Sequence, residues 1–339
     1  MPVVSCHFTD GASFEVDADS GESFLEIALR HGVPIRNQCR SGTCLSCLGR
    51  FAAGSGPLSP RPGRPSSLLP VDKEQGKALC CVSEVTSEGD IYFDYPSDEA
   101  GPSEAKCFID SIEWIASDAV KLTVELADGD WLDFRSGQYV EIAVPDSSQC
   151  RSYSMCTAPN DLPQLAFMVR ILAGGLMSEY LTTIAKPDDV LTLRGPFGGF
   201  AWSGSRSAPQ LFIAGGTGLS PICSILHEIR NVAGAKPPMT LSLGCATPEA
   251  LLAPGYLRLL ESWMPTLSLR LSAEFGDVEG AVMRGNALTA IDFSAVTPQT
   301  EAYVCGPEGL INAATKKLVE VGVPATNIYY ERFVASGAT

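Results

Sequence analysis

CRSGTCLSC, residues 39–47, places three cysteines at the spacing C-x4-C-x2-C. With this spacing, one tight loop supplies three thiolates to a [2Fe–2S] cluster and a distant cysteine supplies the fourth. The small residues at 41–43 allow backbone N–H groups to turn towards the negatively charged sulfur atoms. The stretch therefore predicts an iron–sulfur loop in which Cys39, Cys44 and Cys47 are ligands.

Two neighbouring cysteines, Cys80 and Cys81, compete for the place of the fourth ligand. The alternatives are unligated core cysteines, or a four-cysteine zinc site, which usually pairs two C-x2-C segments. The chain has 12 Cys but only 3 His, and no histidine has a partner at ligand spacing, which argues against a histidine-ligated cluster. We expect structural roles for the three histidines and for six other cysteines, namely His7, His31, His227, Cys6, Cys107, Cys150, Cys156, Cys223 and Cys245.

The composition is that of a globular protein with more than one domain. Its 339 residues exceed a single core of about 100–150 residues, and 45% of them are hydrophobic. The formal net charge is −15 with no run of Lys or Arg, which argues against nucleic acid and anionic membranes as partners. No stretch approaches the roughly 18 apolar residues of a membrane helix, and the first residues lack a secretory signal pattern. We therefore expect a cytoplasmic protein.

Secondary-structure signals divide the chain into three segments. Up to about residue 98, an amphipathic stretch at 23–31 and short strand-like runs form a small α+β pattern, the runs lying at 3–8, 13–16 and 91–95. An interval near residue 100, rich in Ser, Pro, Gly and Glu, has the composition of a linker. Closely spaced strand-like runs then indicate a small β-barrel, at 108–115, 120–126, 138–144, 164–172 and 190–194. Finally, strand-like runs alternate with helix-like stretches and indicate a parallel sheet, with strands at 211–214, 239–244, 267–273 and 301–305.

Two motifs in the barrel segment suit a phosphate-bearing ligand. The first, Arg151-Ser152-Tyr153-Ser154, follows a strand-like run, and the second, Gly174-Gly175-Leu176-Met177-Ser178, opens a predicted helix. Backbone N–H groups at a helix N-terminus can hold a pyrophosphate. The sequence Gly195-Pro196-Phe197-Gly198 closes the barrel pattern.

The last segment carries two glycine motifs at predicted strand ends. LFIAGGTGLSP, residues 211–221, places Gly215–Gly218 between a strand and a helix, although Pro221 stands where G-x-G-x-x-G would have its third glycine. Cys305-Gly306-Pro307 ends another strand, where open α/β sheets bind their ligands. The stretch 243–249 has no Arg or Lys to receive a 2′-phosphate, so we expect NADH rather than NADPH.

Together these motifs resemble the ferredoxin–NADP reductase superfamily, and with the cysteine loop the whole chain resembles the reductase component of bacterial ring-hydroxylating (Rieske) dioxygenases. The resemblance implies a multi-domain α+β and α/β protein. It implies a β-grasp, plant-type [2Fe–2S] ferredoxin domain over 1–98, a linker over 99–105, an antiparallel β-barrel FAD domain over 106–205 and a parallel-sheet NAD-binding domain over 206–339. It also assigns the fourth cluster ligand to Cys81, because a short stretch ending in Thr-Ser follows, at 82–87.

The resemblance further implies roles for individual residues. Arg151 would contact the FAD phosphates, Tyr153 would lie against the isoalloxazine and Ser154 would hydrogen-bond the flavin near N5, with Ser152 in the same motif. Ser178 and the backbone of Gly174, Gly175, Leu176 and Met177 would bind the pyrophosphate, and Phe333 would cover the flavin. The nicotinamide nucleotide would be held by Gly215, Gly216, Thr217, Gly218, Cys305, Gly306 and Pro307. The catalytic residues would be Ser154, Cys305 beside the site of hydride transfer, and Glu331 facing the nicotinamide. The alternatives are a packed core thiol at Cys305 and a solvated charge at Glu331.

The implied activity converts two-electron transfer, as a hydride, into one-electron transfer. NADH gives up two electrons as a hydride, an iron–sulfur cluster accepts one at a time, and FAD links the two. We expect electrons to pass from NADH through FAD and the [2Fe–2S] cluster to the terminal oxygenase of an aromatic-ring-hydroxylating dioxygenase, directly or through a separate ferredoxin. One alternative is the reductase component of a diiron monooxygenase acting on phenol, toluene or methane. An alternative of another class is a non-catalytic [2Fe–2S] electron carrier with degenerate flavin and nucleotide domains, against which the intact motifs argue.

Overall fold

The computed structural model describes residues 2–18, 21–51, 56–64, 66, 68, 70–98 and 102–333. It contains two compact units, one of residues 1–101 together with 197–199, and one of residues 102–196 and 200–339. Within the described residues, no helix has the length and apolar character needed to cross a membrane.

The first unit is built on a five-stranded sheet in the order β2-β1-β7-β3-β5. These strands are β1 (Val3–His7), β2 (Ser13–Asp17), β3 (Leu48–Arg50), β5 (Lys77–Leu79) and β7 (Gly89–Tyr92), and a separate pair is formed by β4 (Leu58–Pro60) and β6 (Ser83–Val85). β1 pairs antiparallel with β2 and parallel with β7, so the first and last strands of the unit are neighbours. This is the predicted β-grasp arrangement.

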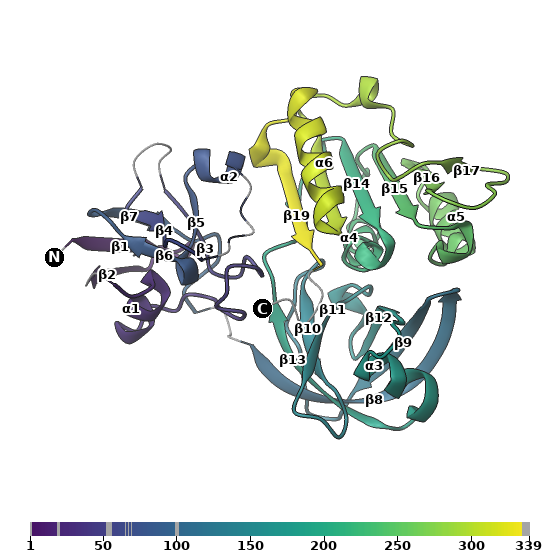
Figure 1. The fold of residues 1–339 in the computed structure, drawn as a ribbon, viewed down its shortest axis with the longest axis horizontal. Coiled ribbons are helices and arrows are strands. Elements are labelled where there is room, and N and C mark those ends of the chain that lie inside the picture. Colours follow the sequence, from purple (N-terminus) through teal and green to yellow (C-terminus); the bar gives the residue numbers. More distant parts are fainter. Residues whose placement is uncertain are drawn as a thin grey trace. The chain divides into compact units, whose positions relative to one another are not determined.

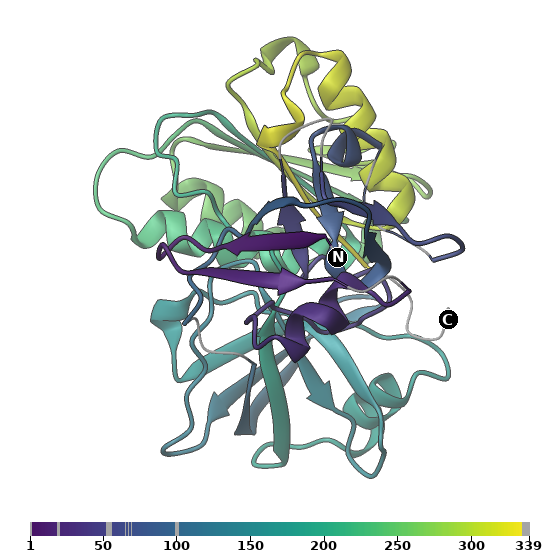
Figure 2. The same ribbon diagram turned by 90° about the vertical axis from the view of Figure 1, so that its left-hand side faces the viewer.

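Helix α1 (Phe24–Arg30) follows the first hairpin and buries its apolar side in the core of the unit (purple in Figure 2). It begins at Ser23, whose hydroxyl accepts the N–H of Glu26 at 3.3 Å, while the Glu26 carboxylate accepts the N–H of Ser23 at 3.2 Å. This capping box satisfies two N–H groups that a helix start leaves unpaired. A second short helix, α2, covers Pro70–Glu74.

The second unit begins with a six-stranded antiparallel sheet in the order β11-β10-β13-β8-β9-β12 (Figure 1). Its strands are β8 (Ser103–Ala116), β9 (Ala119–Leu126), β10 (Tyr139–Ala143), β11 (Cys150–Ser154), β12 (Gln164–Arg170) and β13 (Val190–Phe197). Just beyond β11, an antiparallel bridge joins Met155 to Phe167 of β12, and the Cys156 N–H donates to the Ala166 carbonyl at 2.8 Å. The two edges of the sheet therefore meet, and the sheet closes into the predicted barrel.

The rest of the second unit is a six-stranded parallel sheet in the order β17-β16-β15-β14-β18-β19. Its strands are β14 (Gln210–Gly215), β15 (Met239–Cys245), β16 (Leu267–Ala273), β17 (Val282–Arg284), β18 (Glu301–Gly306) and β19 (Ile328–Arg332). Helices α4 (Leu219–Asn231), α5 (Pro254–Trp263) and α6 (Glu308–Glu320) pack against these strands (Figure 1). Because β14 lies between β15 and β18, the strand order reverses there, and ligands bind at the carboxyl ends of strands at such a switch point.

One hydrophobic core extends from the barrel into the parallel-sheet region. It includes Cys156, Ala166 and Met168 of the barrel together with apolar residues of α4. Two serines of α4 also donate to barrel carbonyls, Ser220 to Ser154 at 2.6 Å and Ser224 to Thr157 at 2.5 Å. Packing and hydrogen bonds therefore fix the barrel against α4.

The predicted fold class is confirmed, and the structure adds detail to two of the motifs. The Arg151–Ser154 motif follows β10, as predicted, and itself lies in β11. The predicted helix after Gly175 is present as α3 (Leu176–Glu179), which continues into a π-helical turn at Tyr180–Ile184. The hydroxyl of Thr183 donates to the Glu179 carbonyl at 2.6 Å, and such back-bonding by β-branched residues bends helices.

The predicted linker falls partly outside the described residues, and so does a stretch rich in Pro, Gly and Ser at residues 52–70. Of the linker 99–105, the structure describes 102–105, and β8 already begins at Ser103. Of the stretch 52–70, it describes 56–64, 66, 68 and 70. The shorter 3₁₀ turns of the chain cover Cys80–Val82, Pro159–Asp161, Gly216–Gly218, Pro248–Ala250, Phe293–Ala295 and Ala325–Asn327.

Candidate functional site

The cysteine loop of the first unit directs backbone N–H groups at a sulfur atom. Three of them lie 3.4 Å from Cys39 Sγ, those of Ser41, Thr43 and Cys44. Three loop residues have left-handed backbone conformations, Arg40 with φ 50°, Gly42 with φ 81° and Leu45 with φ 61°. N–H donors stabilise a thiolate over a thiol. Hydrogen bonds, first from Cys44 and then from Cys81, hold the pKa of Cys39 far below its usual range.

The loop and the second cysteine pair meet through Cys81 rather than Cys80. The Cys81 N–H donates to Cys47 Sγ at 3.4 Å, and hydrogen bonds with Cys39 and Cys47 raise the pKa of the Cys81 thiol. Cys80 is completely buried in the core, where desolvation raises the pKa of its thiol. The side chains of Cys44, Cys39, Cys81 and Cys47 thus form a hydrogen-bonded chain.

These four thiols fit a two-iron cluster in number and surroundings. A [2Fe–2S] cluster takes four thiolates, and N–H groups aimed at its sulfur atoms stabilise their negative charge. Among the described residues, no three His, Cys, Asp or Glu side chains gather around the position of one metal ion. Four thiols are the number of ligands that a [2Fe–2S] cluster takes.

In the barrel, the Arg151–Ser154 motif occupies β11 beside β10. The guanidinium of Arg151 donates to the Cys150 carbonyl at 2.9 Å and to Gln149 Oε1 at 2.5 Å, so its neighbours orient it. Burial raises the pKa of Tyr153 to about 12, and its hydroxyl stays protonated at neutral pH. The strand pairing places Tyr153 opposite Val140.

The Gly174-Gly175 turn is closed from inside by Ser178. Its hydroxyl accepts the Leu172 N–H at 2.9 Å, while the Gly175 N–H donates to the Leu172 carbonyl at 3.0 Å. Gly174 has φ 73°, which a residue with a Cβ rarely adopts. The predicted contact of Ser178 with a pyrophosphate stays a prediction, and in the structure this hydroxyl holds the turn.

The glycine motif after β14 forms a single 3₁₀ turn that leads straight into α4. Gly218 packs so closely against β18 that a Cβ there would lie 2.2 Å from the Cys305 carbonyl oxygen. Gly216 has φ 54° and nothing within 4 Å of the Cβ position, so its open side is free for a ligand. Gly218 therefore allows close packing against β18, and Gly216 leaves space for a ligand.

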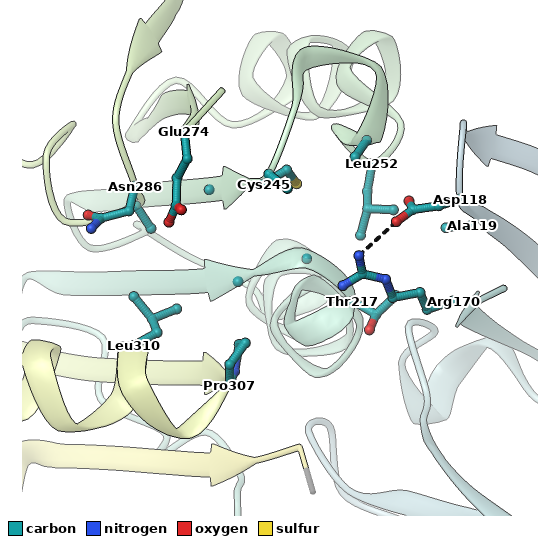
Figure 3. A pocket seen from close by; sticks show the side chains of 16 residues that line it. Asp118, Ala119, Arg170, Thr217, Cys245, Leu252, Glu274, Asn286, Pro307 and Leu310 are labelled. Atoms are coloured by element: carbon teal, nitrogen blue, oxygen red, sulfur yellow. Dashed lines mark ion pairs between the residues drawn. The ribbon is translucent and has the colours of Figure 1, made fainter. Parts of the chain in front are cut away.

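An open cleft with about 750 Å³ of empty space borders this turn (Figure 3). The turn itself, Pro307 and Leu310 line one part of it. Ala246, which follows β15, lines another part, and no basic residue stands there. A cleft bounded by glycines at a switch point suits the backbone approach of a dinucleotide.

The three predicted catalytic residues lie together where β11 faces β18 and β19. Ser154 Oγ donates to Glu331 Oε2 at 3.0 Å, and Cys305 Sγ lies 4.0 Å from the same oxygen. Burial raises the pKa of Glu331 to about 8, although the hydrogen bond from Ser154 opposes this shift. Cys305 is fully buried, as a core thiol would be, but it also borders the Glu331 carboxyl group, which is hydrogen-bonded to Ser154 and desolvated.

Phe333 follows β19 and is fixed by its backbone. Its N–H donates to the Gly306 carbonyl at 3.1 Å, and its ring packs against the core that the barrel and parallel sheet share. Its predicted role as a cover for the flavin stays a prediction.

Four residues of the cleft were missed by the sequence analysis. They are Asp118, Arg170, Glu274 and Asn286. Arg170 ends β12 and Glu274 directly follows β16. A charged residue at the end of a predicted strand was therefore the sequence signal that could have identified these two. They belong to no common motif, and only the tertiary structure brings them to one cleft.

Comparison with known families assigns all three parts of the chain. Residues 8–86 match the 2Fe-2S iron-sulfur cluster binding domain, residues 106–202 the oxidoreductase FAD-binding domain and residues 212–316 the oxidoreductase NAD-binding domain. In this order the three domains define an iron–sulfur flavoprotein reductase, an enzyme that passes electrons from NADH through FAD to a [2Fe–2S] cluster.

Similar proteins extend over nearly the whole chain. The toluate 1,2-dioxygenase electron transfer component of Pseudomonas putida is 29% identical over 98% of both chains. Methane monooxygenase component C of Methylosinus trichosporium is 31% identical over 74% of both. The crystal structure of a cytochrome P450 reductase of Amycolatopsis has a TM-score of 0.71 at 24% identity, covering 98% of this chain and 99% of that one. The chain belongs to the ferredoxin–NADP reductase superfamily, in the family of reductases with an N-terminal plant-type [2Fe–2S] domain that includes the reductase components of ring-hydroxylating dioxygenases.

Proposed function

We propose that this NADH-dependent reductase supplies electrons to the terminal oxygenase of an aromatic-ring-hydroxylating dioxygenase, directly or through a separate ferredoxin. The observation that carries the proposal is the likeness over 98% of the chain to the electron transfer components of toluate and anthranilate 1,2-dioxygenases. The proposed location is the cytoplasm, because a chain with 12 cysteines suits a reducing compartment.

The bound groups supply the redox chemistry: FAD accepts a hydride and releases single electrons, and the cluster accepts them one at a time. The proposed cluster ligands are Cys39, Cys44, Cys47 and Cys81. The other proposed site residues bind and orient FAD and the nicotinamide nucleotide. Arg151, Ser152, Tyr153 and the turn at 174–178 would hold FAD, with Phe333 over its ring.

The nucleotide would lie along Gly215–Gly218 and Gly306-Pro307, with its reactive ring near Cys305. Glu331 is protonated at neutral pH because burial raises its pKa, and its Oε2 accepts the hydrogen bond from the Ser154 hydroxyl. A neutral carboxylic acid avoids placing a fixed negative charge where a hydride passes. The Ser154 hydroxyl is thereby kept in one orientation.

A second candidate partner is a diiron monooxygenase. Its support is the 31% identity with methane monooxygenase component C, and the 27% identity over 95% of this chain with the xylene/toluene monooxygenase electron transfer component of Pseudomonas putida. The two proposals share the reductase chemistry and differ only in the acceptor protein.

The experiment has two stages. In the first, visible spectra of the purified protein are recorded before and after anaerobic addition of NADH, and both flavin and cluster absorption should bleach. In the second, the reduced protein is mixed with a purified Rieske oxygenase or with a purified diiron oxygenase. We expect rapid oxidation by the Rieske protein and slow oxidation by the diiron protein. The opposite preference would overturn the first proposal and support the second.

A further inference from the structure

The start of α4 contacts two of the strands that carry the predicted catalytic residues. Gly218, which directly precedes α4, packs against the end of β18, because a Cβ there would lie 2.2 Å from the Cys305 carbonyl oxygen. Two residues later, the hydroxyl of Ser220 donates at 2.6 Å to the carbonyl of Ser154, the last residue of β11. The segment 218–220 therefore connects β18 of the parallel sheet to β11 of the barrel.

The hydrogen bond between Ser220 and Ser154 lies in a buried part of the protein. Ser220 is 2% exposed and Ser154 is 6% exposed. Leu219 and Ile222, on either side of Ser220 in the same helix, are fully buried in the shared core, so packing holds the donor in place. A buried carbonyl that loses its donor is left without a partner. The position of the Ser154 backbone therefore depends on α4.

The side chain of Ser154 faces the predicted catalytic residues. Its Oγ donates to Glu331 Oε2 at 3.0 Å, and Cys305 Sγ lies 4.0 Å from the same oxygen. Ser154 is thus held on two sides, through its carbonyl by α4 and through its hydroxyl by β19. Because Gly218 also packs against the Cys305 carbonyl, one short segment sets the separation between the barrel side and the parallel-sheet side of this group of residues.

We propose that Ser220 is a positioning residue for hydride transfer, because it holds the end of β11, and with it Ser154, at a fixed distance from the turn at 215–218. The proposal rests on the proposed contacts of Ser154 with the flavin and of the turn with the nucleotide. In the hydride step NADH gives two electrons and one proton to N5 of the flavin and becomes NAD⁺. The rate of such a step depends steeply on the alignment of the reacting groups. Ser220 acts on it through Ser154.

A purely structural hydrogen bond is the competing explanation, and α4 provides a matched control for it. Ser224, one helical turn beyond Ser220, is fully buried and donates to the Thr157 carbonyl at 2.5 Å. It joins the same helix to the same barrel segment through the same chemistry. Thr157 lies beyond β11 and has no part in the predicted site. If both serines only stabilise the packing, replacing either one should have the same consequences.

The test compares Ser220→Ala, Ser220→Thr and Ser224→Ala in the FAD- and cluster-loaded protein. Rapid anaerobic mixing with NADH gives the rate of flavin bleaching at saturation and the NADH concentration that half-saturates it. For Ser220→Ala we expect about a 10- to 100-fold lower rate at saturation, the loss caused by a displacement of about 1 Å, with little change in the half-saturating concentration. Ser220→Thr keeps a hydroxyl and should recover part of the rate. Ser224→Ala should bleach as fast as the unaltered protein.

A second measurement follows the geometry without the reaction. The hydrogen bond from Ser154 opposes the burial that raises the pKa of Glu331 to about 8, so weakening this bond raises the pKa further. Differential scanning calorimetry of Ser220→Ala should therefore show a Tm that continues to fall with pH above about 8. Ser224→Ala should keep the pH profile of the unaltered protein. At pH 7 both alanine variants should have a lower Tm, because each leaves a buried carbonyl without its donor.

Three results would overturn the proposal. The first is an unchanged rate of flavin bleaching in Ser220→Ala, and the second is equal slowing by Ser220→Ala and Ser224→Ala. Should Ser220→Ala fail to fold, Ser220→Cys takes its place, since a thiol is a weaker donor, and an unaltered rate in that variant is the third. If instead the flavin of the unaltered protein does not bleach with NADH, the proposed function itself is wrong. Normal bleaching of the unaltered protein with any of the first three results refutes this inference alone.

Discussion

The carboxyl group of Glu331 titrates at unusually high pH because it is buried beside Ser154 and Cys305, with its pKa raised from 4.5 to about 8. Between these two values the folded protein holds one more proton than the unfolded chain. The free energy of unfolding therefore decreases as pH rises from about 4.5 to about 8, and this dependence ends above the higher value.

The variant Glu331→Gln lacks this proton and should lack its contribution to the pH dependence. We expect the Tm of the unaltered protein to fall more steeply between pH 6 and 9 than the Tm of the variant. Differential scanning calorimetry of both proteins in the same buffers measures the difference. Parallel curves would mean that Glu331 ionises at an ordinary pKa in the folded protein.

Replacing the two adjacent cysteines should have opposite consequences. Cys81→Ser removes a thiol from the hydrogen-bonded chain of Cys39, Cys44 and Cys47, and we expect the purified protein to lose most of its iron and sulfide. Cys80→Ser should keep the full cluster. It should cost about 1–3 kcal/mol of stability, because a hydroxyl replaces a fully buried thiol. Iron analysis and visible absorption check the pair, and loss of iron in the Cys80 variant alone would reverse our assignment.

At the scale of residues, most of the proposed site residues come from local sequence signatures. The cysteine spacing and the glycine turns are sequence patterns whose geometry depends on neighbours in the chain. Arg170, which lines the cleft, belongs to no such pattern, because a strand end of the barrel meets a turn of the parallel sheet only in the folded protein. Ser178 shows the converse: its motif is intact, yet its hydroxyl closes a turn through the Leu172 N–H.

Among the elements, the strands followed the predicted apolar runs closely, since β12 covers Gln164–Arg170 where 164–172 was predicted. The least regular helix is α3, whose extension is a π-helical turn. Hydroxyl groups of threonines compete for backbone carbonyls there, and hydrophobic periodicity carries no information about that competition.

The turn from β14 into α4 depends on a close contact with β18. A Cβ at Gly218 would lie 2.2 Å from the Cys305 carbonyl oxygen, so Gly218→Ala should push these elements apart. We expect a loss of about 1–3 kcal/mol of stability together with weaker NADH binding. The control is Gly255→Ala in α5, where nothing lies within 4 Å of the Cβ position. It should be neutral or stabilising by about 0.5–1 kcal/mol. Chemical denaturation measures both, and equal effects would contradict the packing argument.

At the scale of the whole molecule, the net charge of −15 should govern the encounter with an acceptor protein. Salt screens charges beyond about 8 Å at physiological ionic strength, so steering by an acidic surface weakens as salt is added. We expect the rate of electron transfer to the oxygenase or ferredoxin to fall with increasing salt. Reduction of a small neutral quinone under the same conditions should change little. Stopped-flow traces at several salt concentrations compare the two, and a rate to the protein acceptor that is insensitive to salt would exclude charge steering.

The hydroxyl groups of Ser220 and Ser224, one helical turn apart on α4, end on carbonyls of the barrel at Ser154 and Thr157. The barrel and the parallel sheet also share a hydrophobic core. Although the sequence contains three recognisable domains, we expect the barrel and the parallel sheet to unfold together. A chimera that exchanges only the parallel-sheet domain would therefore lose the hydrogen bonds between α4 and the barrel, unless the new helix carries hydroxyl groups at the same positions. The barrel and the parallel sheet can instead be transferred together as one unit.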